Sequence, residues 1–406
     1  MGKSIHGTGN SSIFMFVSNT TTVNIGLLGT TYCGMASVAK ESSVCAVVGY
    51  TGKIRKLGIH IPTNPRTGAG TIRVRKNTGN GNQAISIGGG QTGFLESASA
   101  DDDIAAGDEI CASITAGSGT GDMYFNGPWC EVETTGDHYT TMASAYQQAE
   151  IASASTYYWP IGGTTEYNSS ESDKIKLKVQ APGTLSRLFA QVWSNSCDGA
   201  VTLSIKGAAT TNLSCSIPAG KITGSVCDVT NSDAIAVGNN ICIKGVSGGT
   251  TGICRISMMG ATFKGDDATH WDLFKQCIYQ RLAATTWYLS PFGRQSAETV
   301  EANSQIQIPS NMKASHLRAY FDAAGNYQTI RTRINGGNGG QSITTNGTQG
   351  WFTDVSGSDN LVAGDKLCYE WSSTNSVGVY IRSVAMLMGD DIAASQIQPY
   401  MVVVSC

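Results

Sequence analysis

The acidic side chains best arranged to bind a metal are three consecutive aspartates at residues 101–103. A Ca²⁺ site needs several oxygen ligands that converge from one loop. When the chain is aligned on its internal repeat, Asp102 coincides with Asp233 and Asp359, but only the first copy carries the acidic run. An aspartate that closes a turn by hydrogen bonding to its own backbone explains this column better. A glycoside hydrolase would need a second acidic column, and none accompanies this one.

The cysteines follow neither the pattern of a metal site nor that of a disulfide framework. Of the 12 cysteines, four fall in residues 29–137, five in residues 155–266 and one in residues 285–390. A framework would recur between copies of a repeat, and this distribution does not. No Cys-x-x-Cys pair occurs, and no histidine has metal-ligand spacing to a cysteine. We expect reduced, buried thiols that pack as small hydrophobic side chains.

Two motifs that would mark nucleotide or zinc chemistry are missing. The chain has no Gly-x-x-x-x-Gly-Lys-Ser/Thr loop for phosphate and no His-Glu-x-x-His helix for zinc. Glycine-rich runs at 79–81 and 336–340 follow strand-like segments without a helix after them, which is the context of a turn. The sequence therefore predicts a protein that is not an enzyme, with no catalytic residue, no cofactor and no metal ligand.

Aromatic side chains offer one further kind of site, a platform on which sugar rings stack. Trp351 and Phe94 share one column of the repeat, but Ser225 interrupts it. Trp159 and Trp287 lie near the starts of their copies, where burial against a sheet is the commoner arrangement. We favour core packing for these rings and keep a carbohydrate platform as the alternative.

An internal repeat organises the whole chain. The phrase Ile-Ala-Ala-Gly-Asp-Glu-Ile-Cys at 104–111 returns in related form at 235–242 and 361–368, with cysteine spacings of 131 and 126 residues. Upstream of it, apolar and polar residues alternate at the same place in each copy. This alternation predicts strands with one face on a core and the other in water. The alternating segments are residues 72–75, 201–205 and 330–334.

These signals predict an all-β protein of three tandem jelly-roll-like β-sandwich domains, with short helical connectors and extended termini. A connector helix is expected where Trp271, Phe274, Ile278 and Leu282 are spaced three, four and four residues apart. A weaker candidate precedes the second copy. The expected boundaries are an N-terminal arm at 1–28, sandwiches at 29–137, 155–266 and 285–390, connectors at 138–154 and 267–284, and a C-terminal strand or tail at 391–406.

Composition excludes some partners. The net charge of −3 argues against phosphate contacts with nucleic acid, and the basic clusters at 53–56 and 73–76 alternate with apolar residues as strands do. No run of eighteen apolar residues encodes a membrane span, and residues 1–6 lack the layout of a signal peptide. We expect synthesis in a cytoplasm and no membrane partner.

Three short phrases carry a resemblance to a known class. They are residues 71–77, 93–94 and 106–108 in the first copy, and 331–336, 351–354 and 363–365 in the third. They are similar to repeats in predicted virion proteins of tailed bacteriophages, and the similarity spans residues 29–390. The second copy departs from the pattern, because Gly207 and two alanines replace the Asn-Gly turn.

The resemblance implies an exterior virion component without catalytic activity, most simply a capsid-decorating (cement) protein that is located on the virion surface and binds it through loops and terminal arms. Its partners would be capsid or other virion proteins, with self-assembly through the terminal arms as a further possibility. A tail appendage, or an adhesin that binds host glycan, is the first alternative, and an extracellular filament subunit is the second. Three fused copies would either mimic a homotrimer at a local threefold position or line up as a stalk.

Overall fold

The computed structural model describes most of the chain, and the account of the fold is confined to that part. The described residues are 15–17, 22–26, 30–31, 45–98, 100–134, 139–161, 167–207, 212–221, 223–266, 272–273, 280–282, 286–291, 299–308, 311–321, 328–345, 347–373, 379–389 and 397–398.

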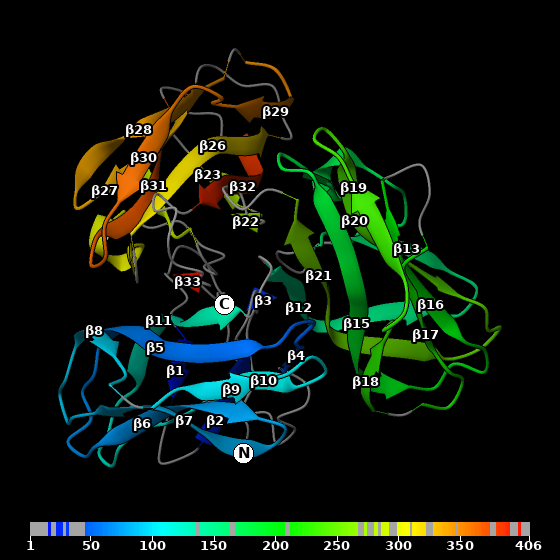
Figure 1. The fold of residues 1–406 in the computed structure, drawn as a ribbon, viewed down its shortest axis with the longest axis horizontal. Helices are drawn as coiled ribbons and strands as arrows, with labels where there is room; N and C mark the ends of the chain where they lie inside the picture. Colours follow the sequence, from blue (N-terminus) through cyan, green and yellow to red (C-terminus); the bar gives the residue numbers. More distant parts are fainter. Residues whose placement is uncertain are drawn as a thin grey trace.

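Three β-sandwiches follow one another along the chain, as the sequence predicts, and each packs a six-stranded sheet on a five-stranded sheet (Figure 1). In repeat 1 the two sheets also include strands from both ends of the chain. The six-stranded sheet holds β1 (Met15–Val17), β11 (Met123–Thr134), β5 (Gly52–Thr63), β8 (Gly93–Glu96), β9 (Asp102–Ile104) and β33 (Ile397–Gln398). The five-stranded sheet holds β2 (Thr22–Gly26), β10 (Glu109–Thr115), β6 (Gly70–Lys76), β7 (Gly79–Ile87) and β4 (Ala46–Val47).

Repeat 2 has the same plan, with the 3-10 turn η2 (Asp173–Ile175) before β14. Its six-stranded sheet holds β18 (Gly224–Cys227), β15 (Gly183–Asn195), β21 (Ile253–Gly265), β12 (Tyr139–Ala152), β3 (Thr30–Thr31) and β19 (Ser232–Ile235). Its five-stranded sheet holds β13 (Thr156–Trp159), β20 (Asn240–Ser247), β16 (Val201–Lys206), β17 (Ser214–Ile217) and β14 (Leu177–Lys178).

Repeat 3 repeats the plan again, with η3 (Glu301–Asn303) before β25. Its six-stranded sheet holds β22 (Asp272–Leu273), β23 (Gln280–Leu282), β32 (Val379–Gly389), β26 (Met312–Phe321), β29 (Gly350–Thr353) and β30 (Ser358–Leu361). Its five-stranded sheet holds β24 (Thr286–Leu289), β31 (Lys366–Ser373), β27 (Gln328–Ile334), β28 (Gly337–Thr344) and β25 (Ile306–Gln307).

The shared phrase that reveals the repeat is one turn, built three times. Gly107, Gly238 and Gly364 have positive φ angles of 100°, 89° and 94°, a conformation that glycine adopts without strain. The residue after each glycine accepts a hydrogen bond from the backbone N–H three residues before it, which closes the turn. The acceptors and donors are Asp108 and Ala105 (2.8 Å), Asn239 and Ala236 (2.8 Å), and Asp365 and Val362 (2.9 Å).

The apolar and polar residues that alternate in the sequence alternate in the same way between buried and more exposed positions. Ile72 and Val74 on β6 are fully buried, as are Val201 and Leu203 on β16 and Ile330 on β27. These side chains fill the space between the two sheets of each sandwich, and the polar residues between them face outward. Each sandwich therefore has its own core.

The predicted helical connector at 138–154 is wrong. Residues 139–152 form β12, a long strand that pairs antiparallel with β21. The placement of Met142, Tyr146, Ala149 and Ile151 suggested a helix. However, Ala149 and Ile151 are buried while Glu150 between them is exposed, which is strand periodicity. Hydrogen bonds to a neighbouring strand here outweigh local helix propensity.

The helix predicted over 267–284 is wrong wherever the structure describes that segment. Residues 272–273 and 280–282 are the short strands β22 and β23, and both pair with β32. The edge of β32 supplies backbone partners that a free connector would lack. The other residues of this predicted helix, including Trp271 and Phe274, lie outside the described residues.

Both ends of the chain enter sheets of other parts of the molecule. Within the expected N-terminal arm, β1 pairs with β11 and β2 with β10, so these segments belong to repeat 1. Further on, β3 crosses to repeat 2 and pairs in parallel with β12. The C-terminal strand β33 reaches back to repeat 1 and pairs with β11. No helix among the described residues is long and apolar enough to cross a membrane.

Candidate interaction surfaces

The aspartate column is structural in all three repeats. Asp102, Asp233 and Asp359 are buried, with 6%, 2% and 4% of each residue exposed. Each carboxylate accepts hydrogen bonds from donors of the neighbouring hairpin. Without the aspartate these donors would lack an acceptor. Asp102 accepts hydrogen bonds from the backbone N–H groups of Asn82 and Gln83, the latter at 2.9 Å. Asp233 accepts from the backbone N–H groups of Asn212 (2.6 Å) and Leu213 (3.2 Å). Asp359 accepts from the Gly340 N–H, from Thr332 Oγ1 (2.7 Å) and from Gln341 Nε2 (2.8 Å). The described residues contain no group of three or more His, Cys, Asp or Glu side chains suited to a metal ion.

Residues 245–249 form a Gly-x-Ser-x-Gly pattern that the sequence reasoning missed, and this pattern marks the nucleophile elbow of many hydrolases. That elbow needs an exposed serine on a turn from a strand into a helix. Here Ser247 is 4% exposed at the end of β20, and the chain turns directly into another strand, β21. Its hydroxyl lies 3.9 Å from the Cys197 sulfur. Ser247 is therefore a packing residue of a β-turn and not a nucleophile.

The aromatic rings take three different positions. Trp159 is fully buried, and Trp287 packs against the core of repeat 3. Trp351 is half-buried and meets Tyr320 edge to face, with ring centroids 5.6 Å apart. Phe94 lies at the seam between repeats 1 and 3. The expectation of core packing is confirmed for Trp159 and Trp287, whereas Trp351 and Phe94 lie outside the sandwich cores.

The basic cluster at 53–56 lies on one face of β5 and is paired with acids of its own sheet. Lys53 lies 3.8 Å from Asp103, and Lys56 lies 3.8 Å from Glu131. Arg55 donates to Glu133, and this hydrogen bond raises the pKa of the guanidinium. Ile54 between them is fully buried in the core. The predicted strand with one solvated face is confirmed here.

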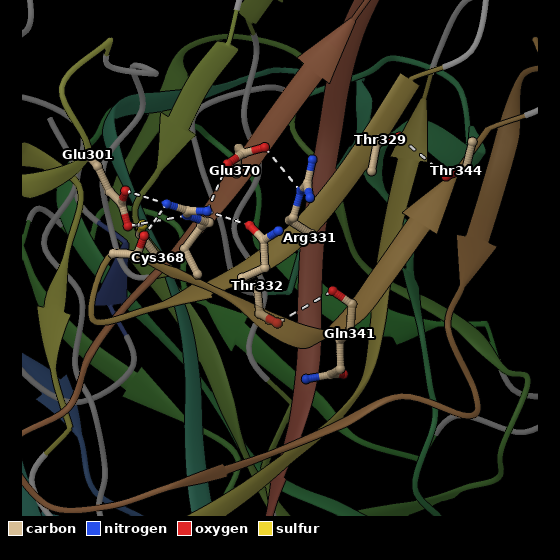
Figure 2. Close-up of polar contacts among 11 residues, drawn as sticks. Glu301, Thr329, Arg331, Thr332, Gln341, Thr344, Cys368 and Glu370 are labelled. Carbon is tan, nitrogen blue, oxygen red and sulfur yellow. Dashed lines mark hydrogen bonds and ion pairs between the residues drawn. The ribbon is translucent and has the colours of Figure 1, made fainter.

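A denser polar cluster lies on the outer face of the five-stranded sheet of repeat 3 (Figure 2). Arg333 joins two carboxylates, since its guanidinium lies 3.0 Å from Glu301 and 3.4 Å from Glu370. Arg331 lies 3.0 Å from the other oxygen of Glu370. The hydrogen bond to Glu301 raises the pKa of Arg333, and burial raises the pKa of the Cys368 thiol. Through these ion pairs, Arg333 on β27 is joined to η3 and to β31, so the cluster links three segments of the repeat.

The equivalent outer faces of the other repeats differ in charge. Strand pairing places Arg73 and Arg75 of repeat 1 where repeat 3 has Arg331 and Arg333, but Ser113 stands in place of Glu370. In repeat 2 the same positions are Ser204, Lys206 and Lys244. The carboxylate that neutralises this face in repeat 3 is therefore replaced by a neutral or basic residue in the other two. One chain thus presents three chemically different faces on a common frame.

The three sandwiches contact one another pairwise and form a closed triangle (Figure 1). Phe189 and Met258 of repeat 2 pack into the hydrophobic cluster of repeat 1. Leu387 of repeat 3 packs into the cluster of repeat 2. Repeats 1 and 3 meet where the Lys366 ammonium lies over the Phe94 ring at 5.6 Å from its centroid. The strands β3 and β33 tie the same neighbours together through the backbone.

The seam between repeats 1 and 3 contains a perturbed histidine. His60 stacks on Phe94 with ring centroids 4.1 Å apart and 12° between the planes. Burial, and to a smaller extent the nearby charge of Lys366, lowers the pKa of His60 to about 4. Beside them, Gln307 Nε2 donates to Glu96 Oε1 at 3.3 Å. This seam is thus built for a neutral histidine.

Each six-stranded sheet has one face on its own core and an opposite face turned toward the other sandwiches, here called the inner face. Arg318 is an unusual residue on the inner face of repeat 3. It lies on β26 between Leu317 and Ala319, which point into the core, so its side chain is on the face turned toward the other sandwiches. It is 0% exposed, and its three side-chain nitrogens have no hydrogen-bond partner within the described part of the chain. Burial lowers the pKa of its guanidinium to about 10. Burying this cation costs desolvation free energy and so lowers the stability of the folded chain.

Comparisons of the sequence with known proteins found no match. No protein-family model matches it, and no curated protein matches it. One solved structure, described as the atomic structure of Sulfolobus Turreted Icosahedral Virus, is similar at 10% identity and a TM-score of 0.18, covering 86% of each chain. Another, described as the triple jelly roll fold and turret assembly in an archaeal virus, is similar at 10% identity and a TM-score of 0.18, covering 96% of this chain and 92% of that one.

Proposed function

We propose that this chain is a non-enzymatic structural protein of a virion, and that it attaches as a ready-made pseudo-trimer to a threefold position of a protein shell. The observation that carries the proposal is the closed triangle of three sandwiches, in which every pair of repeats is in contact. A triangular body matches a threefold position in a way that a linear stalk does not.

Divergence of the repeats fits such an attachment. A homotrimer presents three identical faces, whereas this chain carries a basic pair at Arg73 and Arg75 and a neutralised cluster around Glu301 and Glu370. Charge complementarity selects partners and suppresses wrong ones. Three different faces suit a local threefold whose surrounding subunits are not equivalent.

Within this role, decoration of the capsid exterior of a tailed phage is the version we favour, and a tail appendage is the runner-up. The terminal strands β1 and β33 both pair with β11 of their own chain, so an exchange of arms between chains would have to break these pairings first. A filament built by exchanging these arms is therefore disfavoured.

A glycan-binding adhesin has weaker support. Sugar platforms need flat, exposed aromatic faces. Trp351 is half-buried against Tyr320, and Phe94 is stacked on His60 in a seam. Neither ring is free to serve as an open platform.

The test is binding of the purified chain to particles from which it has been stripped. We expect saturation at one chain per threefold position, measured by mass photometry or quantitative gel densitometry, with density over that position in electron micrographs. Saturation at three chains per position, or absence of the chain from purified virions, would refute the proposal.

A matched pair of variants tests whether the closed triangle matters. Leu387→Asp places a charge in the contact between repeats 2 and 3, where Leu387 is 2% exposed. Val300→Asp makes the same kind of change at a residue that is 53% exposed. We expect the first to weaken particle binding and the second to leave it unchanged; equal binding by both would show that the triangle is not required.

A further inference from the structure

We propose that Cys45 and Cys111 form a disulfide under oxidising conditions, so that repeat 1 carries a covalent latch at its seam with repeat 2. The two sulfur atoms are 2.7 Å apart. Cys45 precedes Ala46 on β4, and Ala46 pairs with Ile110, the neighbour of Cys111 on β10. The pair thus joins an edge strand to the centre of its sheet.

The sulfurs lie apart from the main core. Ala46 and Ile110 belong to the hydrophobic cluster between the sheets, whereas Cys45 and Cys111 form a separate cluster with Trp193 of repeat 2. Gln191, two residues before Trp193, donates from Nε2 to the Cys45 carbonyl at 3.1 Å. A bond between the sulfurs would therefore fix the surface on which repeat 2 rests.

The arrangement is specific to one repeat. Cys242 and Cys368 occupy the position of Cys111 in repeats 2 and 3. The position of Cys45, one residue before the strand that pairs with β20 or β31, is Lys176 in repeat 2 and Gln305 in repeat 3. Of the three repeats, only the first has a cysteine at both positions, so only there can the two thiols form a pair.

The oxidant must be small, because Cys45 is 2% exposed and Cys111 is fully buried. Hydrogen peroxide meets this requirement. One thiolate attacks the peroxide and becomes a sulfenic acid, releasing hydroxide that leaves as water once protonated. The second sulfur attacks the sulfenic sulfur and expels a second water, so two thiols are oxidised and one peroxide is reduced to two waters.

The disulfide would act at a short strand on the edge of its sheet. Strand β4 pairs with β10 through two residues only, Ala46 and Val47. Cys45 and Cys111 are 66 residues apart in the sequence. A disulfide between them would close a long loop and so restrict the unfolded chain strongly. We expect oxidation to raise the melting temperature by about 5 °C.

The experiment uses the purified full-length chain, treated with hydrogen peroxide or kept reduced, then alkylated after unfolding and digested. Mass spectrometry should find a Cys45–Cys111 linked peptide, lighter than the two thiol peptides by two hydrogens, only after oxidation. Cys130→Ser removes another fully buried thiol of the same sandwich and should keep the linked peptide. Cys45→Ser should remove it and also remove the rise in melting temperature.

Three results would overturn the latch. They are full alkylation of Cys45 and Cys111 in the oxidised wild-type chain, a sulfinic acid on either residue without the linked peptide, and a linked peptide that joins either one to a different cysteine. If Cys45→Ser does not fold, the wild-type comparison between oxidised and reduced samples decides the question by itself. Because the isolated chain is used, these results are independent of any role in a virion.

Discussion

Replacing Arg318 by methionine should stabilise the isolated protein. Arg318 is fully buried, and none of its guanidinium nitrogens has a hydrogen-bond partner within the described residues. Methionine has a similar length and no charge, so it can fill the same space without the cost of desolvating a cation. Removing an uncompensated buried charge is one of the few single changes that stabilise a fold substantially.

The size of the effect follows from the perturbed guanidinium. Its pKa falls from 12.5 to about 10 because burial disfavours the charged form. Each unit corresponds to about 1.4 kcal/mol, so the folded state bears a penalty of about 3 kcal/mol at neutral pH. Imperfect packing of methionine would offset part of this. We therefore expect Arg318→Met to raise the free energy of unfolding by about 2 kcal/mol.

The pH dependence has a definite sign. A cation whose pKa is lower in the folded state loses its penalty only as pH rises above about 10, because the folded chain then gives up the proton while the unfolded chain still keeps it. The difference between Arg318→Met and wild type should therefore stay constant between pH 6 and pH 9.

Urea unfolding of both proteins, followed by tryptophan fluorescence, measures the effect. Ala385→Ser, a small change at the residue paired with Arg318 on β32, serves as the control for disturbance of the inner face. If Arg318→Met is less stable than wild type by more than 1 kcal/mol, the guanidinium makes a stabilising interaction in the folded chain and the expectation is refuted.

Three further changes test the repeat and its seams. Asp359→Ala should lower the free energy of unfolding by about 3 kcal/mol, measured by urea unfolding, because it leaves buried donors of β27 and β28 without an acceptor. Gly238→Ala should cost about 1 kcal/mol in the same assay and Gly238→Asn less, since the φ of 89° strains a side chain although no atom lies within 4 Å of where its Cβ would stand. His60→Phe should reduce the loss of melting temperature between pH 6.5 and pH 4, because a histidine whose pKa is lowered to about 4 favours proton uptake by the unfolded chain in that range; an unchanged pH profile would contradict this.

The sandwiches could be predicted because each local signal agreed with the fold. The alternating strand at 330–334 is followed by Asn335 and Gly336, whose φ angles of 51° and 81° form the tight hairpin turn that the sequence indicates. The Gly-Asp phrase recurs because a positive φ and a side-chain acceptor are both needed to close the same turn. Such signals lie within a few residues of the structure they determine.

The connectors and the inner faces could not be predicted in the same way. Residues 139–152 become a strand only because the edge of β21 lies beside them, and nothing in their own composition reveals that neighbour. Arg318 follows a leucine in an ordinary alternating segment, so its sequence context predicts a solvated side chain. Arg318 pairs with Thr353 and Ala385, which are distant in the sequence, so its burial depends on contacts that its own segment does not reveal.

The same contacts explain why the three repeats diverged. Gly58, Phe189 and Arg318 occupy one position, because each follows the leucine whose carbonyl accepts a hydrogen bond from Ser97, Asp228 or Asp354. Phe189 packs into the cluster of repeat 1, whereas Arg318 places a fully buried cation at the same position of repeat 3. In a homotrimer one residue would have to satisfy all three sites at once. Fusion removes that constraint, so each repeat can match a different neighbour and the three are no longer interchangeable within the triangle.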